Sequence, residues 1–232
     1  VYDTDFAADM TIVEEANELV ERIKNGGKLP MITSCSPGWV KYCEHYYPEF
    51  TENLSTCKSP QQMFGALAKT WYAEKTGIDP KDIFVVGIMP CTAKKFETKR
   101  EDESASGYPD VDVALTTREL ARMIKEAGIR FNELPDEAPD MPFGLGTGAG
   151  VIFGTTDGVA EAVARRVMAD ESRNTLQAIA YSSLRGSGAI RAAELHVGDK
   201  IIRVGVIHGL ANAKRLIAQM EPERSILTSS RS

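Results

Sequence analysis

Short apolar runs alternate with amphipathic helical patterns along most of the chain, and this alternation most limits its possible folds. The runs are LPMITSC, DIFVVGIMPC, DVALTT and DKIIRVGVIHG, with helical patterns between them. Strands that alternate with helices favour a parallel or mixed β-sheet flanked by helices. The 232 residues suffice for one large domain or two small ones. We therefore predict an α/β fold.

Start and stop signals place the helices between these runs. Thr11 and Glu14 form a T-x-x-E capping box, which predicts that the first helix begins there. Gly26 is expected to end it. The continuous apolar run DIFVVGIMPC predicts a buried strand. Further helices are predicted from Pro37 to about residue 47, from Pro60 to about residue 75, from 117 to near 128, over GVAEAVARRVMA and over LANAKRLIAQM.

Composition excludes several classes of protein. The net charge of −6 and pI near 5.3 argue against a general nucleic-acid or anionic-membrane binder. The sequence has no apolar run of the ~18 residues that span a bilayer, and its acidic start does not resemble a signal peptide. The four cysteines show no CxxC spacing, so a disulfide framework is not indicated and a reducing cytoplasm is expected.

Cys35 and Cys91 share a setting that the other two cysteines lack. Each ends an apolar run beside a proline, and ligand sites in α/β sheets gather at the carboxyl ends of strands. Two such thiols suit a soft metal or an iron–sulfur cluster, although two cannot fill four coordination positions. A nucleophilic role requires a histidine base, and none of the three histidines stands out. A structural role also stays open, and it is the expected role of Cys43 and Cys57.

Two further patterns each allow a functional interpretation and one without a specific function. The glycine-rich segment from Gly144 to Gly154 could hold a phosphate, or it could let the backbone pass close to a bulky neighbour. On the first predicted helix, Glu15, Glu18 and Arg22 lie along one ridge. This ridge is either a solvated charged face or, if Glu15 turns inward, a carboxylate wire that carries protons toward a thiol.

Several motifs in order resemble the catalytic domain of iron-only (FeFe) hydrogenases. TSCSPGW and MPCTAKKFE are similar to the first two of the three signature motifs of that family. Supporting matches are VYDTDFAADMTIVEEA, CKSPQQMFGA, TTRELARMIKEAGI, GAGVIFGTTDGV and LRGSGAIRAAEL, so that the resemblance extends from Val1 to about Met220.

This resemblance implies a two-lobed fold and an H-cluster, which is a four-iron cubane linked to a two-iron unit with carbonyl and cyanide ligands. The implied reaction interconverts protons and electrons with dihydrogen. Cys91 matches a cubane ligand, and Cys35 matches the cysteine that carries protons to the two-iron unit. The resemblance places Glu15, Ser55, Glu18 and Arg22 on the proton path, and Ser59, Pro60, Gln61, Met89, Lys94, Phe153 and Gly154 around the two-iron unit.

The chain departs from the family pattern at two places. Ser36 stands where most members have a cubane cysteine, so either Cys35 or Ser36 is expected to ligate iron there. The third motif, with two more cysteines, does not occur before Ser232. We therefore expect residues 1–232 to be an incomplete catalytic domain, with sub-lobes of about 1–110 and 111–232, which does not assemble a working H-cluster alone.

Three functional hypotheses remain open. The first is a hydrogenase whose implied partners are ferredoxin or other electron-transfer subunits and the hydrogenase maturation proteins. The second is a hydrogenase-like protein without catalysis that serves in cluster handling, sensing or scaffolding. The third, based on the glycine-rich segment alone, is a nucleotide-binding α/β domain.

Overall fold

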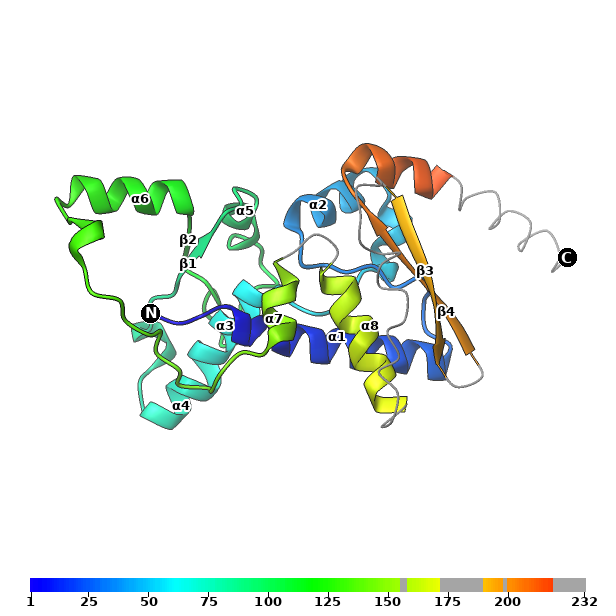
Figure 1. Ribbon diagram of the computed structural model, residues 1–232, viewed down its shortest axis with the longest axis horizontal. Helices are drawn as coiled ribbons and strands as arrows, with labels where there is room; N and C mark the ends of the chain where they lie inside the picture. The colour runs from blue at the N-terminus through cyan, green and yellow to red at the C-terminus, as the bar shows by residue number, and fades with distance from the viewer. Residues whose placement is uncertain (155–157, 172–189, 198–199, 219–232) are drawn as a thin grey trace, which may run out of the picture. The chain divides into compact units, whose positions relative to one another are not determined.

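The computed structural model describes residues 1–154, 158–171, 190–197 and 200–218 (Figure 1). The chain divides into two compact units, Val1–Val151 and Ile152–Ser232. The sequence had suggested a sub-lobe boundary near residue 110. The structure instead keeps the segment after 110 in the first unit, because strand β2 (Val113–Thr116) pairs there with β1 (Val86–Met89).

The first unit is mainly helical. Its α-helices are α1 (Asp5–Asn25), α2 (Pro37–Tyr46), α3 (Pro60–Leu67), α4 (Ala73–Thr76), α5 (Lys94–Glu97) and α6 (Thr117–Glu126), and α7 (Gly148–Phe153) begins in this unit. Its shorter turns are η1 (Pro48–Asn53), η2 (Ala68–Tyr72), η3 (Pro80–Asp82) and η4 (Phe131–Glu133), of which η2 is a π-helix.

Helix α1 begins earlier than the sequence predicted. The expected capping box at Thr11 is wrong, since Thr11 is buried inside the helix and its hydroxyl donates to the Ala7 carbonyl at 3.0 Å. The predicted end is confirmed, because Gly26 caps the helix in the left-handed region at φ 72°. Ile12 and Ala16 form part of a buried stripe, and α1 packs against α3.

The two strands of the first unit pair in parallel, with Val86 opposite Val113 (Figure 1). The prediction of a buried strand is wrong here, because the Val86 side chain is half-exposed, at 44%. A run that is apolar on both faces suits a parallel sheet covered on both sides, and in the described part of this unit the sheet has two strands. LPMITSC forms only a single parallel bridge, between Ile32 and Leu54.

Other helix predictions are confirmed. Pro37 and Pro60 begin α2 and α3, and Gly77 ends the stretch of α3, η2 and α4 at φ 70°. A capping box does occur before α6, where the Thr116 hydroxyl and the Glu119 carboxylate satisfy each other's backbone N–H groups.

The second unit joins α8 (Gly158–Glu171) to an antiparallel pair, β3 (Ile190–Val197) and β4 (Lys200–Ile207). Both strands pack against α8, and residues 210–218 are helical. Glu194 faces Arg203 across the pair, and their side chains form a 3.1 Å ion pair. Strand β3 was not predicted. The α/β class with mixed sheets is confirmed.

Gly65 of α3 lies against the backbone of Asp110, and its replacement tests that packing. A Cβ at this position would overlap the Asp110 carbonyl, whereas a Cβ at Gly38 in α2 would meet no atom within 4 Å. We expect Gly65→Ala to lower the free energy of unfolding by about 1–3 kcal/mol, as overpacking does. Gly38→Ala should raise it by about 0.5–1 kcal/mol. Urea denaturation of both variants measures the difference, and equal effects would contradict this packing.

Candidate functional site

The Glu15 carboxyl is buried in the first unit, as the proton-wire interpretation required. Its side chain has no exposed surface, and among the described residues neither oxygen forms a hydrogen bond of ordinary distance and angle, although Ser34 and Ser55 lie close to it. Burial raises its pKa from 4.5 to about 7, and the neighbouring Glu18 charge also raises it, whereas Ser55 and the Ser34 N–H act to lower it. Glu15 therefore exchanges a proton near neutral pH.

Ser55 and Glu18 continue from Glu15 toward the surface. The Ser55 hydroxyl donates to Glu18 Oε2 at 2.9 Å, and the Thr56 N–H donates to the same oxygen at 3.0 Å. Burial acts to raise the pKa of Glu18, but hydrogen bonds from Ser55 and Arg22 outweigh it and hold that pKa below its ordinary value. Glu15, Ser55 and Glu18 are called the relay below.

Arg22 closes the outer end of the relay. Its guanidinium donates to Glu18 Oε1 from two nitrogens, at 2.6 and 3.0 Å. Its remaining donors reach backbone carbonyls, including that of Leu54 at 2.7 Å. Figure 1 shows α1, which carries Glu15, Glu18 and Arg22, as the long blue helix of the chain's beginning.

The two signature segments meet at Cys35. The Lys94 ammonium, from the second segment, donates to the Cys35 carbonyl at 2.9 Å. Burial raises the pKa of the Cys35 thiol to about 11, and the charge of Glu15 adds to this while Lys94 opposes it. Cys35 is therefore a neutral thiol at physiological pH, within the electrostatic reach of Glu15.

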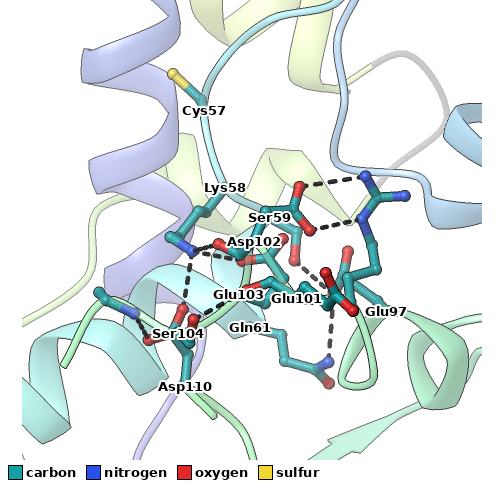
Figure 2. Close-up of polar contacts among 12 residues, drawn as sticks. Cys57, Lys58, Ser59, Gln61, Glu97, Glu101, Asp102, Glu103, Ser104 and Asp110 are labelled. Atoms are coloured by element: carbon teal, nitrogen blue, oxygen red, sulfur yellow. Dashed lines mark hydrogen bonds and ion pairs between the residues drawn. The ribbon is translucent and has the colours of Figure 1, made fainter. Parts of the chain in front are cut away.

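Glu97 organises the other side of this region. Its carboxylate accepts hydrogen bonds from the Ser59 hydroxyl at 2.8 Å and from the Gln61 amide at 3.3 Å (Figure 2). It also forms an ion pair with Lys94 at 3.0 Å. Only 3% of Glu97 is exposed. Glu97 was not among the site residues predicted from the sequence, although it closes the M-P-C-x-x-K-x-x-E motif, which was the available signal.

The remaining predicted site residues are less closely connected. Cys91 and Met89 lie at the end of β1 and are half-buried, and Pro60 is buried at the start of α3. Ser36 is exposed, and its side chain makes no capping bond to α2. Phe153 and Gly154 belong to the second unit, so their place beside the other site residues stays a prediction.

The thiols do not form a complete metal-ligand set. Within the described ranges, no group of three or more histidine, cysteine or acidic side chains is placed to hold a metal ion. Cys43 is fully buried and its thiol points to the Tyr47 carbonyl, as expected of a structural cysteine. The thiol of Cys57, for which a structural role was also expected, lies 3.6 Å from Glu18 Oε2.

The segment from Lys99 to Asp110 is rich in charged residues, and Lys58 binds its acidic side chains. Asp110 is fully buried, and Lys58 donates to Asp110 at 2.9 Å, to Glu103 at 2.7 Å and to the Asp102 carbonyl at 2.9 Å (Figure 2). The three donors of one ammonium thus fix this segment beside the site.

Two glycines of the glycine-rich segment, Gly146 and Gly150, lie in close contact with the start of α1. A Cβ at Gly150 would collide with the Asp5 carbonyl oxygen, and a Cβ at Gly146 would lie 3.1 Å from the Phe6 nitrogen. The Thr147 hydroxyl donates to Asp9 at 2.8 Å. The interpretation as a tight backbone passage therefore has a specific neighbour, which is the first turns of α1.

Comparisons with known proteins give one family. The family model described as "Iron only hydrogenase large subunit, C-terminal domain" matches residues 1–226. The chain is 48% identical over 223 residues to the NADP-reducing hydrogenase subunit HndD of Solidesulfovibrio fructosivorans, covering 94% of this chain and 38% of that protein. It is 49% identical over 212 residues to iron hydrogenase 1 of Clostridium pasteurianum, covering 91% and 37% respectively.

Solved structures agree with the family model. The fold matches an apo [FeFe]-hydrogenase HydA1 variant from Chlamydomonas reinhardtii with a TM-score of 0.81 and 37% identity, over 97% of this chain and 64% of that one. The chain thus spans less than two thirds of each of these relatives. None of the described helices is both long and apolar enough to cross a bilayer. Because the family model matches almost the entire sequence, this chain belongs to the family of C-terminal domains of iron-only hydrogenases.

Proposed function

We propose that the protein containing this chain interconverts protons and electrons with dihydrogen at an H-cluster, and that this chain supplies the proton relay. The observation that carries the proposal is the buried Glu15 carboxyl, whose pKa near 7 lets it bind and release protons at physiological pH. Ser55 and Glu18 connect it outward, and Cys35 is the nearby thiol whose pKa its charge raises.

The relay residues have complementary roles. A hydroxyl both donates and accepts, so Ser55 can receive a proton from one carboxyl and pass its own to the other. Glu18, with its lowered pKa, is the ionised end, and Glu15 is the end that holds the proton. Arg22 fixes Glu18 through two hydrogen bonds to one oxygen. Cys35 is the proposed final carrier.

Residues around Glu97 are proposed to line the two-iron unit. Ser59, Gln61 and Lys94 share one buried carboxylate, which limits their rotamers. The Gln61 carbonyl oxygen is buried without a hydrogen bond in the described part of the chain and lies against Gly87 of β1. The proposal extends, through the family resemblance, to Pro60, Met89, Phe153 and Gly154.

Iron ligation is incomplete in the described residues. A cubane requires four ligands, usually thiolates, and the resemblance offers Cys91 with Cys35 or Ser36. Cys43 and Cys57 are engaged elsewhere. The described residues therefore fit part of the pocket and do not supply the whole ligand set, and no catalytic step through the cluster is derived from them.

Ferredoxin or other electron-transfer subunits, together with hydrogenase maturation proteins, are the proposed partners. The proposed compartment is the cytoplasm, the usual setting for a chain whose cysteines are free. The relay favours catalysis over the scaffold hypothesis, because a scaffold needs no titratable carboxyl held in the interior against the cost of its burial.

Removing a relay group should stop proton delivery. In the full-length protein, matured with its H-cluster, we expect Glu15→Gln, Glu18→Gln and Ser55→Ala each to lower hydrogen evolution by ~100-fold or more, the scale of positioned proton transfer. Gas chromatography with a reduced electron donor measures the rate. The control is Glu14→Gln, a neighbouring carboxylate that is exposed on the same helix.

Two results would contradict the proposal. The first is a wild-type protein that contains iron and sulfide after maturation and yet neither evolves nor oxidises hydrogen. The second is a folded Glu15→Gln variant that turns over at the rate of Glu14→Gln.

The pKa of Glu15 also predicts how stability depends on pH. The folded state binds the Glu15 proton more tightly than the unfolded state does. The contribution of Glu15 to the free energy of unfolding is therefore largest below pH 4.5, and it falls as the pH rises to about 7. A shift from 4.5 to about 7 corresponds to ~3 kcal/mol. Glu15→Gln should remove this loss, so that urea denaturation at pH 5 and pH 8 shows a smaller difference for the variant. Identical differences in both proteins would show that Glu15 is not held protonated.

A further inference from the structure

The surface end of the relay at Arg22 is poorly suited to admit protons. A guanidinium group has only hydrogen-bond donors and accepts no hydrogen bond. Its donors are occupied by Glu18 and by the carbonyls of Lys28, Glu52, Asn53 and Leu54. The Arg22 and Glu18 side chains are only 12% and 15% exposed. Arg22 therefore blocks the entry of protons at this end of the relay.

A different side of the relay faces solvent. A cavity of about 340 Å³ in the first unit has Ser55, Thr56 and Cys57 in its wall. This volume is far above the ~15 Å³ that one water molecule needs. The Ser55 hydroxyl therefore lies between the buried Glu15 region and a space large enough for several waters.

The other walls of the cavity are polar and charged. Its ionisable groups are Glu44, Lys58, Glu97, Arg100, Asp102 and Glu103. Both cations are held by carboxylates, since Lys58 contacts Glu103 at 2.7 Å and Arg100 contacts Glu44 at 2.9 Å (Figure 2 shows Lys58). Acidic groups outnumber basic ones, so that the walls favour water and protons over anions.

Cys57 connects this cavity to the relay. Its thiol donates to Glu18 Oε2 at 3.6 Å, and its backbone N–H donates to the Ser55 hydroxyl oxygen at 3.1 Å. Burial raises the pKa of the thiol to about 12, so that it keeps its proton and remains a donor to Glu18.

From this geometry we propose that protons reach the relay from the 340 Å³ cavity through the Cys57 thiol, and not past Arg22. The inference rests on the relay of the proposed function. A hydronium ion in the cavity gives a proton to the sulfur of Cys57 and becomes water, while the S–H proton of Cys57 passes to the Glu18 carboxylate. Glu18 then gives a proton to Ser55, and the Ser55 hydroxyl proton passes to Glu15. Each donor is restored, and no charge stays on the sulfur.

Filling or enlarging the cavity at one position tests the route on this chain without a cofactor. Val40 of α2 lines the cavity and is 9% exposed. Val40→Phe reduces the cavity, and Val40→Ala is the matched control that enlarges it. The readout is the rate at which the Glu15 carboxylic-acid infrared band takes up deuterium after mixing with D₂O, with the band assigned by its absence in Glu15→Gln.

We expect Val40→Phe to slow this exchange about tenfold, equal to ~1.4 kcal/mol in the barrier, and Val40→Ala not to slow it. Cys57→Ala should slow it similarly, and Cys57→Ser, which keeps a donor and acceptor, should restore it. Cys43→Ala is the control for loss of a buried thiol outside the cavity. Circular dichroism confirms that each variant is folded.

Wild-type exchange in folded Val40→Phe and Cys57→Ala would overturn the inference, as would equal slowing in Val40→Ala. Since exchange is measured without turnover, this result is separate from hydrogen evolution. A failure of the proposed function would appear as absent turnover in the matured protein, whatever the exchange rates are.

Discussion

The burial of one carboxyl, that of Glu15, is the constraint on which the site depends. Burying a carboxylate without partners is costly, so that the group shifts its pKa and keeps a proton near neutral pH. The same burial places this proton next to the Ser55 hydroxyl and near the Cys35 thiol. The apolar stripe of α1, which packs on α3, holds Glu15 in this position.

A second buried carboxylate, Glu97, has the opposite character. It is ion-paired with Lys94 and accepts hydrogen bonds from Ser59 and Gln61, so its charge is compensated. Lys94 also donates to the Cys35 carbonyl, which joins the two signature segments. The Glu15 carboxyl is therefore able to bind or release a proton near neutral pH, while the Glu97 carboxylate fixes the side chains around it. The difference comes from their partners, since the two groups are chemically the same.

Sequence signals predicted helix ends correctly where the backbone preference of one residue decides. They failed where the structure around the segment decides. Gly26 and Gly77 marked helix ends because a left-handed residue is a backbone property of glycine. The pattern T-x-x-E is a capping box at Thr116, which follows a strand, but the same pattern lies inside a helix at Thr11. The two four-residue patterns are equivalent by themselves. The two positions differ in what precedes them, which is helix at Thr11 and strand at Thr116.

By itself, the sequence determined the α/β class, most helix ends and the family, because these depend on periodicity, backbone preference and ordered motifs. Only the tertiary structure showed that Glu15 is buried and that Glu97 binds three side chains. It also showed that Lys58 forms a hydrogen bond with the buried Asp110. It also opened a cavity beside Cys57. The physical reason is that burial, pKa and hydrogen-bond partners depend on residues distant in the chain, which local patterns do not encode.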